Sequence, residues 1–196
     1  MTTESPLDIP MLRGPVALAH LFMRSFLQEG DRAVDATCGN GSDTLLMAGL
    51  VGDAGRVWAF DIQQAAIDQT GYRLAAAGQE RQVELICAGH ETLSDHVKDG
   101  ISLVMFNLGY LPGGDRSIIT RPETTATALG MALSCLKPGG VLALTIYPGH
   151  DGGKREQHLV DSWSVGLDPR SFHAWRMGQT NAAPDAPYFM LIQKAA

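Results

Sequence analysis

Hydrophobic and small residues recur along the chain in short runs separated by glycine-rich or polar turns. Apolar side chains at helical spacing predict a helix from Pro15 to Leu27. Similar patterns predict further helices over residues 43–50, 64–77, 124–136 and 154–163. Short apolar or alternating runs predict strands after Asp31 and over residues 56–61, 82–87, 101–106, 141–147, 171–177 and 188–194. Residues 137–140, Lys-Pro-Gly-Gly, are expected to form a turn.

The order of these elements indicates an α/β fold. Strands and helices alternate through five positions, and two final strands follow. Residues 101–106 are almost wholly apolar, as expected for a strand buried on both faces of a parallel sheet. The chain is therefore expected to form one doubly wound, Rossmann-like domain over residues 1–196, with residues 1–13 as a loosely held lead-in.

A glycine-rich turn after the first strand is the feature around which the chain is organised. It reads D-A-T-C-G-N-G-S-D-T from Asp35 to Thr44. A dinucleotide fingerprint would place its third glycine where Thr44 stands, and no Gly-Lys-Ser/Thr follows for a phosphate-binding loop. The acidic turn instead resembles motif I of class I S-adenosylmethionine methyltransferases, whose ligand is cationic near the reacting sulfur. Asp61 ends the next strand, where an acid can accept hydrogen bonds from both ribose hydroxyls.

Composition indicates the class of protein and its expected location. With 45% hydrophobic and 18% charged residues, the chain has the composition of an ordinary globular protein, and its N-terminus lacks the pattern of a signal peptide. No run reaches the roughly 20 apolar residues of a membrane span, so a cytoplasmic location is expected. The three cysteines are scattered, which argues against a disulfide framework and against a metal site. Cys38 is expected to be a small, semi-buried side chain.

The net charge of −6 is distributed unevenly. Residues 1–100 hold 14 acidic and 7 basic residues, whereas residues 101–196 hold 7 acidic and 8 basic ones. A polyanion would therefore bind the surface formed by the second half of the chain. Its candidate contacts are Arg116, Arg121, Lys154, Arg155, Arg170 and Arg176; the alternative, that these are solvated surface charges, stays open.

Three loops should meet at one cleft. Ligands of doubly wound sheets lie beyond the carboxyl ends of the strands, where residues 37–43, 107–115 and 147–153 are expected. Asn107-Leu-Gly-Tyr110 has the spacing of the Asp/Asn-Pro-Pro-Tyr/Phe motif of nucleobase amino-methyltransferases. In that motif an oxygen accepts from the attacking amine and the ring stacks on the base. His150 or Asp151 is a candidate proton acceptor, and His90 either lines the adenine pocket or lies in a surface loop.

Four motifs together resemble the bacterial tRNA 5-aminomethyl-(2-thio)uridine wobble methyltransferase family, formerly described as putative rRNA methylases. They read D-A-T-C-G-N-G-S-D-T, F-N-L-G-Y-L-P-G-G-D, T-R-P-E-T-T and Y-P-G-H-D-G-G, and the similarity runs from about Pro15 to Lys194. The resemblance implies a sheet of order 3-2-1-4-5-7-6 with strand 7 antiparallel. It also implies S-adenosylmethionine as methyl donor, S-adenosylhomocysteine as product and a tRNA anticodon loop as partner, without DNA or membrane. Around residues 179–181 the sequence departs from the family's N-Q-x-N, and a homodimer is left open.

The predicted site has a donor side and an acceptor side. The expected donor contacts are Asp35, Thr37, Gly39, Asn40, Gly41, Asp43, Thr44, Asp61, Gln63, Gly89, His90 and Asn107. The expected catalytic residues are Asn107, Tyr110, His150 and Asp151. The expected substrate contacts are Asp115, Arg116, Arg121, Thr124, Thr125, Tyr147 and Asn181. The resulting interpretation is an N-methyltransferase that converts aminomethyl to methylaminomethyl on a wobble uridine. An rRNA or small-molecule methyltransferase and a catalytically silent donor-binding module remain alternatives.

Overall fold

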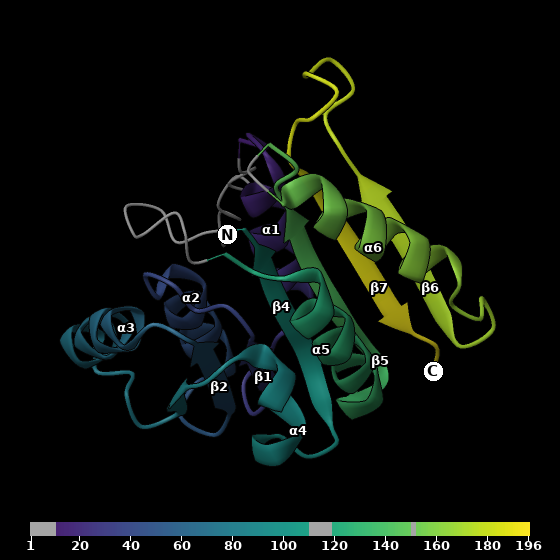
Figure 1. The fold of residues 1–196 in the computed structure, drawn as a ribbon. Coiled ribbons are helices and arrows are strands. Elements are labelled where there is room, and N and C mark those ends of the chain that lie inside the picture. The colour runs from purple at the N-terminus through teal and green to yellow at the C-terminus, as the bar shows by residue number, and fades with distance from the viewer. Residues whose placement is uncertain (1–10, 110–118, 150–151) are drawn as a thin grey trace, which may run out of the picture.

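Seven strands form one sheet at the centre of the molecule (Figure 1). They are β1 (Arg32–Asp35), β2 (Arg56–Asp61), β3 (Val83–Cys87), β4 (Ile101–Leu108), β5 (Leu136–Ile146), β6 (Phe172–Met177) and β7 (Tyr188–Lys194). The computed structural model describes residues 11–109, 119–149 and 152–196. The strand order is β3-β2-β1-β4-β5-β7-β6, and β7 runs antiparallel to both of its neighbours. The predicted fold and strand order are confirmed.

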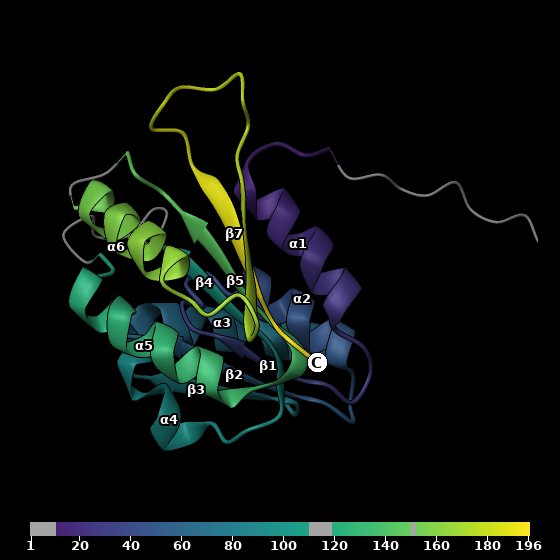
Figure 2. The same cartoon turned by 90° about the vertical axis from the view of Figure 1, so that its right-hand side faces the viewer.

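Helices cover both faces of this sheet (Figure 2). They are α1 (Pro15–Phe26), α2 (Ser42–Val51), α3 (Gln64–Ala77), α4 (Leu93–His96), α5 (Pro122–Cys135) and α6 (Gly153–Val165), with a short 3-10 turn, η1 (His90–Thr92). One apolar core lies between the sheet and α1, α2 and α3, and a second lies between the sheet and α4, α5 and α6. The central strand β4 is buried on both faces, with Phe106 and Leu108 in the second core. No helix among the described residues is long and apolar enough to cross a membrane.

The structure corrects the prediction at two places. The Lys-Pro-Gly-Gly segment, expected as a turn, belongs to β5, which begins at Leu136. Leu136 pairs with Ile101, and a register shift between Ile101 and Leu103 accommodates the proline and glycines before regular pairing resumes at Val141. The segment after β3, for which the sequence pattern predicted no helix, forms η1 and α4 and buries His90 and Leu93.

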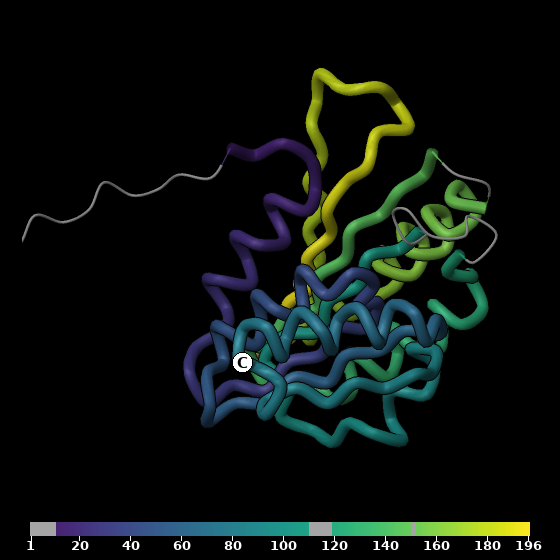
Figure 3. Tube along the Cα trace, turned by 90° about the vertical axis from the view of Figure 1, so that its left-hand side faces the viewer, coloured from purple at the N-terminus to yellow at the C-terminus, as the bar shows by residue number. Residues whose placement is uncertain are grey.

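The parallel strands align their carboxyl ends along one edge of the sheet. β1, β2, β3, β4 and β5 pair in parallel register, so the segments that follow all five strands leave from that edge. The connection between β6 and β7, residues 178–187, rises beyond the same edge (Figure 3). The chain therefore brings six separate segments to one place, and the site is built there.

Candidate methyl-transfer site

A buried carboxylate, Asp35, stabilises the turn after β1 through hydrogen bonds. Asp35 is completely buried, and it accepts hydrogen bonds from the Thr44 hydroxyl at 2.6 Å and from the Thr37 backbone N–H at 3.3 Å. Gly41 is the N-cap of α2 and has φ +79°, and a Cβ there would lie 2.7 Å from the hydroxyl of Thr70. A side chain at this position would thus be strained and would clash. Asp35 acts on this turn as a support beneath it, and donor contact by Asp35 stays a prediction.

Burial also changes the acidity of Asp35. Loss of solvent, reinforced by the negative charge of Asp43, raises the pKa of the Asp35 carboxyl from the ordinary value of 3.8 to about 7. The two hydrogen bonds oppose this shift but do not cancel it. A cation bound above the turn would favour the ionised form, which suits a sulfonium-bearing ligand.

This shift predicts how stability depends on pH. A carboxyl whose pKa is higher in the folded state stabilises the fold most below its unfolded pKa, and that contribution is lost as the pH rises through about 7. We expect Asp35→Asn, which is neutral at every pH, to remove this loss. Thermal unfolding of both proteins from pH 5 to pH 8.5 should show the wild type losing stability relative to the variant up to about pH 7 and running parallel to it above that pH. Parallel curves between pH 5 and pH 7 would contradict the assignment.

Asp61 links the first two strands at the same edge. Its Oδ2 accepts from the Gly39 backbone N–H at 3.0 Å, and its Oδ1 accepts from the Gln63 N–H at 2.9 Å. The carboxylate lines the cavity described below, and each oxygen keeps a further lone pair. It can therefore order the glycine turn and still accept from ligand hydroxyls.

His90 contributes a buried ring at the end of β3. The residue is 7% exposed, its ring contacts Phe106 edge-on, and its Nε2 has no hydrogen-bond partner among the described residues. Burial lowers the pKa of the imidazole, so the ring is neutral near pH 7. His90 lines the cavity, which excludes the alternative of a surface loop residue. An unpartnered nitrogen there fits a ligand with polar edges, as adenine has.

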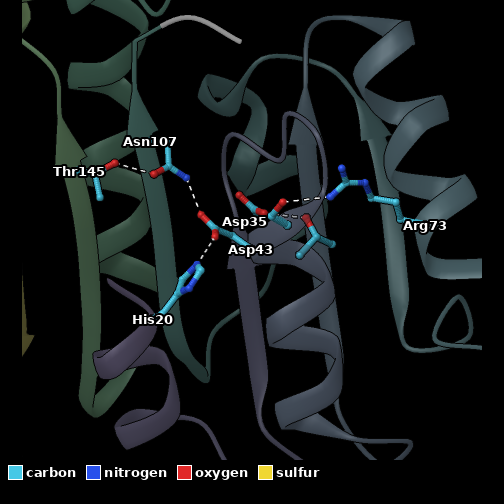
Figure 4. A network of polar contacts seen from close by, with 8 residues as sticks. His20, Asp35, Asp43, Arg73, Asn107 and Thr145 are labelled. Atoms are coloured by element: carbon cyan, nitrogen blue, oxygen red, sulfur yellow. Dashed lines mark hydrogen bonds and ion pairs between the residues drawn. The ribbon is translucent and has the colours of Figure 1, made fainter. Parts of the chain in front are cut away.

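Asn107 lies at the centre of a polar network at the end of β4 (Figure 4). Its Nδ2 donates to Asp43 Oδ2 at 2.7 Å, and its Oδ1 accepts from the Thr145 hydroxyl at 2.5 Å. His20 of α1 contacts the other oxygen of Asp43 at 2.7 Å. The backbone N–H of Asn107 donates to the Thr37 hydroxyl at 2.7 Å, which joins β4 to the glycine turn. An ionised carboxylate can only accept, so Asp43 fixes which end of the amide faces Thr145.

One cavity of about 1080 Å³ is lined by Thr37, Asp43, Asp61, His90 and Asn107. Small-molecule sites commonly measure about 300–1,000 Å³, so this cavity has room for a nucleoside-sized ligand and part of a second molecule. Donor-side residues meet acceptor-side residues across Asn107, which belongs to both predicted sets. Tyr147 closes the acceptor side, and burial raises the pKa of its hydroxyl, which therefore stays protonated at neutral pH.

The cavity collects most, but not all, of the predicted residues. Those that line it are Thr37, Gly39, Asn40, Asp43, Asp61, Gln63, Gly89, His90, Asn107, Arg121, Thr124 and Tyr147. Asp35, Gly41 and Thr44 lie behind the turn rather than on the cavity wall. Predicted residues that lie outside the described part of the chain are Tyr110, Asp115, Arg116, His150 and Asp151.

Two predicted substrate contacts do not reach the cavity. Thr125 is fully buried, and its hydroxyl donates to Glu156 at 2.7 Å. Asn181 lies exposed in the β6–β7 connection, where its side chain accepts from Gln179, whereas Asp185 and Pro187 of the same segment do line the cavity. Thr125 does not line the cavity because it is on the inward face of α5, next to α6. Asn181 does not line it because the connection turns inward only after this residue, and substrate contact by Asn181 stays a prediction.

Several site residues carry no sequence signal of their own. Val16 and His20 belong to an amphipathic helix, Thr145 lies inside an apolar strand, and Glu156 reads as an exposed helical acid. The hydrogen-bond partners of His20, Thr145 and Glu156 are between 23 and 38 residues away in the chain. Asp185, another cavity residue that was not predicted, could have been suspected from the polar, proline-bearing stretch between the last two strands. The described residues contain no group of three His, Cys, Asp or Glu able to hold a metal ion.

Comparisons with known proteins agree with this geometry. The profile of the family described as "Putative rRNA methylase" matches residues 57–193. A chloroplastic tRNA (mnm(5)s(2)U34)-methyltransferase from Arabidopsis thaliana is 39% identical over 187 residues, which cover 90% of this chain and 68% of that protein. A structure described as a putative rRNA-methylase from Clostridium thermocellum has 41% identity and a TM-score of 0.91, covering 94% of this chain and 100% of that one.

A second solved relative holds a ligand. A putative methyltransferase from Streptococcus mutans in complex with SAH is 35% identical, with a TM-score of 0.85 over 94% of this chain and 99% of that chain. The sheet order, the acidic glycine turn and the cavity at the carboxyl edge, together with these relatives, define a class I S-adenosylmethionine-dependent methyltransferase. Within that class the chain belongs to the family described as "Putative rRNA methylase". The resemblance stated from the sequence is confirmed.

Proposed function

We propose that this enzyme methylates the amino nitrogen of a 5-aminomethyl group on the wobble uridine of tRNA, in the anticodon loop. The observation that carries the proposal is the position of Asn107, at the cavity end of β4 with its amide orientation fixed by Asp43 and Thr145. The Arabidopsis relative, whose name specifies a modified uridine at tRNA position 34, supports this substrate class.

The donor side fits S-adenosylmethionine by its chemistry. Asp61 offers carboxylate lone pairs for ribose hydroxyls, the neutral His90 offers an unpartnered nitrogen, and Gly39 brings backbone close to the ligand. When bound, the donor supplies a methyl group on a sulfonium that a nucleophilic amine can displace. Asp43, which lines the cavity, adds negative charge where a cationic ligand would bind.

On the acceptor side, Asn107 would orient the substrate amine. An amide oxygen has two lone pairs, and Thr145 uses one of them, so one remains to accept from a substrate N–H. Such a contact aims the nitrogen lone pair, and alignment of reacting atoms is a large part of what a displacement reaction requires. The free amine is mostly protonated at neutral pH, so a proton must leave before transfer. His150 and Asp151 remain the proposed acceptors of that proton.

Methylation of defined RNAs tests the proposal directly. The enzyme is incubated with labelled donor and anticodon stem-loops carrying 5-aminomethyluridine, with or without a 2-thio group, 5-hydroxymethyluridine or plain uridine. We expect methylaminomethyluridine, identified by mass spectrometry, from the aminomethyl substrates alone. The family description favours one rival substrate, so fragments of rRNA form a parallel arm. Methylation of rRNA alone would overturn the proposal, and absence of turnover on every RNA would favour a donor-binding module.

The charge distribution predicts a salt dependence. Arg121 is exposed at the start of α5 and lines the cavity, so it is placed to meet a phosphate. We expect Arg121→Gln to lower the slope of log affinity against log salt for the stem-loop by about 0.7–0.9, the share of one phosphate contact. Arg56 is the control, because it lies at the opposite edge of the sheet and pairs with Glu84. An equal change in slope for Arg56→Gln would rule out this RNA face.

A further inference from the structure

Glu156 is a buried acid that none of the functional roles described so far uses. It stands in the first turn of α6 and is 1% exposed. None of the ion pairs among the described residues involves it. Burying a carboxylate without a cation costs stability unless strong hydrogen bonds compensate. Its surroundings must therefore provide such bonds.

Two threonine hydroxyls provide them, one for each carboxylate oxygen. Thr120 donates to Oε2 at 2.6 Å, and Thr125 donates to Oε1 at 2.7 Å. These lengths are typical of charge-assisted O–H···O⁻ bonds, which are roughly twice as strong as neutral ones. The backbone N–H of Glu156 also bonds to the Gly152 carbonyl, and the acid lies at the end of the helix where negative charge is favoured.

The two threonines support the acceptor-side wall of the cavity, because Thr120 lines the cavity and Thr125 lies buried behind that wall. The backbone N–H of Thr120 donates to the Gly109 carbonyl at 2.9 Å, so the segment leaving β4 and the segment entering α5 are tied together there. Gly109, Thr120, Arg121 and Thr124 all line the cavity. Arg121 and Thr124 lie in sequence between the two threonines that Glu156 holds.

We propose that Glu156 is a positioning residue for the second substrate, a role that rests on the function proposed above. By holding Thr120 and Thr125 it fixes the wall that Arg121 and Thr124 present to the cavity, and it contacts neither ligand itself. The T-R-P-E-T-T motif, residues 120–125, then has two tasks. Its first and last threonines bind Glu156, and Arg121 and Thr124 between them face the cavity.

The proposed role predicts that a change at Glu156 weakens binding of the RNA substrate but not binding of the donor. Glu156→Gln keeps the shape of the side chain but replaces two charge-assisted bonds with neutral ones, and one amide head must donate. We expect the KM for the stem-loop to rise about 10-fold with kcat little changed, and the Kd for S-adenosylhomocysteine to stay within about twofold. Thr125→Val should reproduce part of the rise in KM. In the double variant, KM should rise by less than the product of the two single-variant increases. Thr127→Val is the control, because that exposed hydroxyl bonds only within α5.

Hydrogen exchange tests the same role without any substrate. In Glu156→Gln we expect faster amide exchange in residues 119–125 and unchanged exchange in the donor turn, residues 37–44. Unchanged exchange at 119–125, equal loosening of both segments, or a donor Kd that weakens in step with KM would overturn the proposal. If the wild type fails to methylate the stem-loop, the proposed function fails by itself. The exchange data still decide whether Glu156 holds this wall.

Discussion

Asp61→Ala is expected to weaken donor binding about 10- to 100-fold while leaving the fold intact. The carboxylate accepts from the backbone N–H groups of Gly39 and Gln63 and faces the cavity, so its loss removes ribose acceptors and frees the glycine turn. A hydrogen bond to a charged group contributes about 1.5–3 kcal/mol, which corresponds to that range of dissociation constants. Titration calorimetry with S-adenosylhomocysteine measures the change.

Two further variants separate binding from support of the turn. Asp61→Asn keeps one oxygen that can accept a backbone N–H, so its loss of affinity should be smaller than that of the alanine variant. Asp68→Ala removes an exposed acid on α3 that bonds only to Gln64 and should leave affinity unchanged. A folded Asp61→Ala protein that binds the donor as tightly as the wild type would remove Asp61 from the donor site.

The fold followed from the sequence because its strands are buried runs with clear ends. Residues 56–61, 64–77 and 188–194 begin and end where the pattern predicted, since glycine and polar turns border them. Where the prediction was wrong, a tertiary contact overrode the local signal. Pairing with Ile101 extends β5 back through Pro138, and Leu93 is buried in the second core on α4, where the pattern predicted no helix.

The candidate site was predictable where one motif supplies both the turn and the side chain. Gly39, Asp43 and Asp61 reach the cavity for that reason. Contacts between distant segments were not predictable, because nothing near His20 or Glu156 in the sequence marks its partner. Thr124 and Thr125 were both predicted as substrate contacts because they belong to one family motif, but only Thr124 lines the cavity. A helix turns by about 100° per residue, so adjacent positions cannot all face one cavity.

Asn107→Ala is expected to lower the rate of methyl transfer about a hundredfold or more. The variant removes the oxygen proposed to orient the amine, and misalignment by about 1 Å can cost on the order of 100-fold. It also removes one donor from Asp43, but His20 still holds the other oxygen of that carboxylate. Donor affinity should therefore change little, and the loss should appear in the chemical step.

Thr145→Val distinguishes the orienting role of Asn107 from simple packing. This variant leaves the amide bound to Asp43 and removes only the hydroxyl that donates to Oδ1, so we expect a rate between those of wild type and Asn107→Ala. Single-turnover methylation at saturating donor and stem-loop isolates the transfer step from binding and release. The structure predicts a graded series, because Thr145→Val removes one constraint on the amide oxygen and Asn107→Ala removes the oxygen itself. Equal single-turnover rates for wild type and Asn107→Ala would place the acceptor site elsewhere in the cavity. In that case the interpretation of Asn107-Leu-Gly-Tyr110 as the acceptor motif would have to be abandoned.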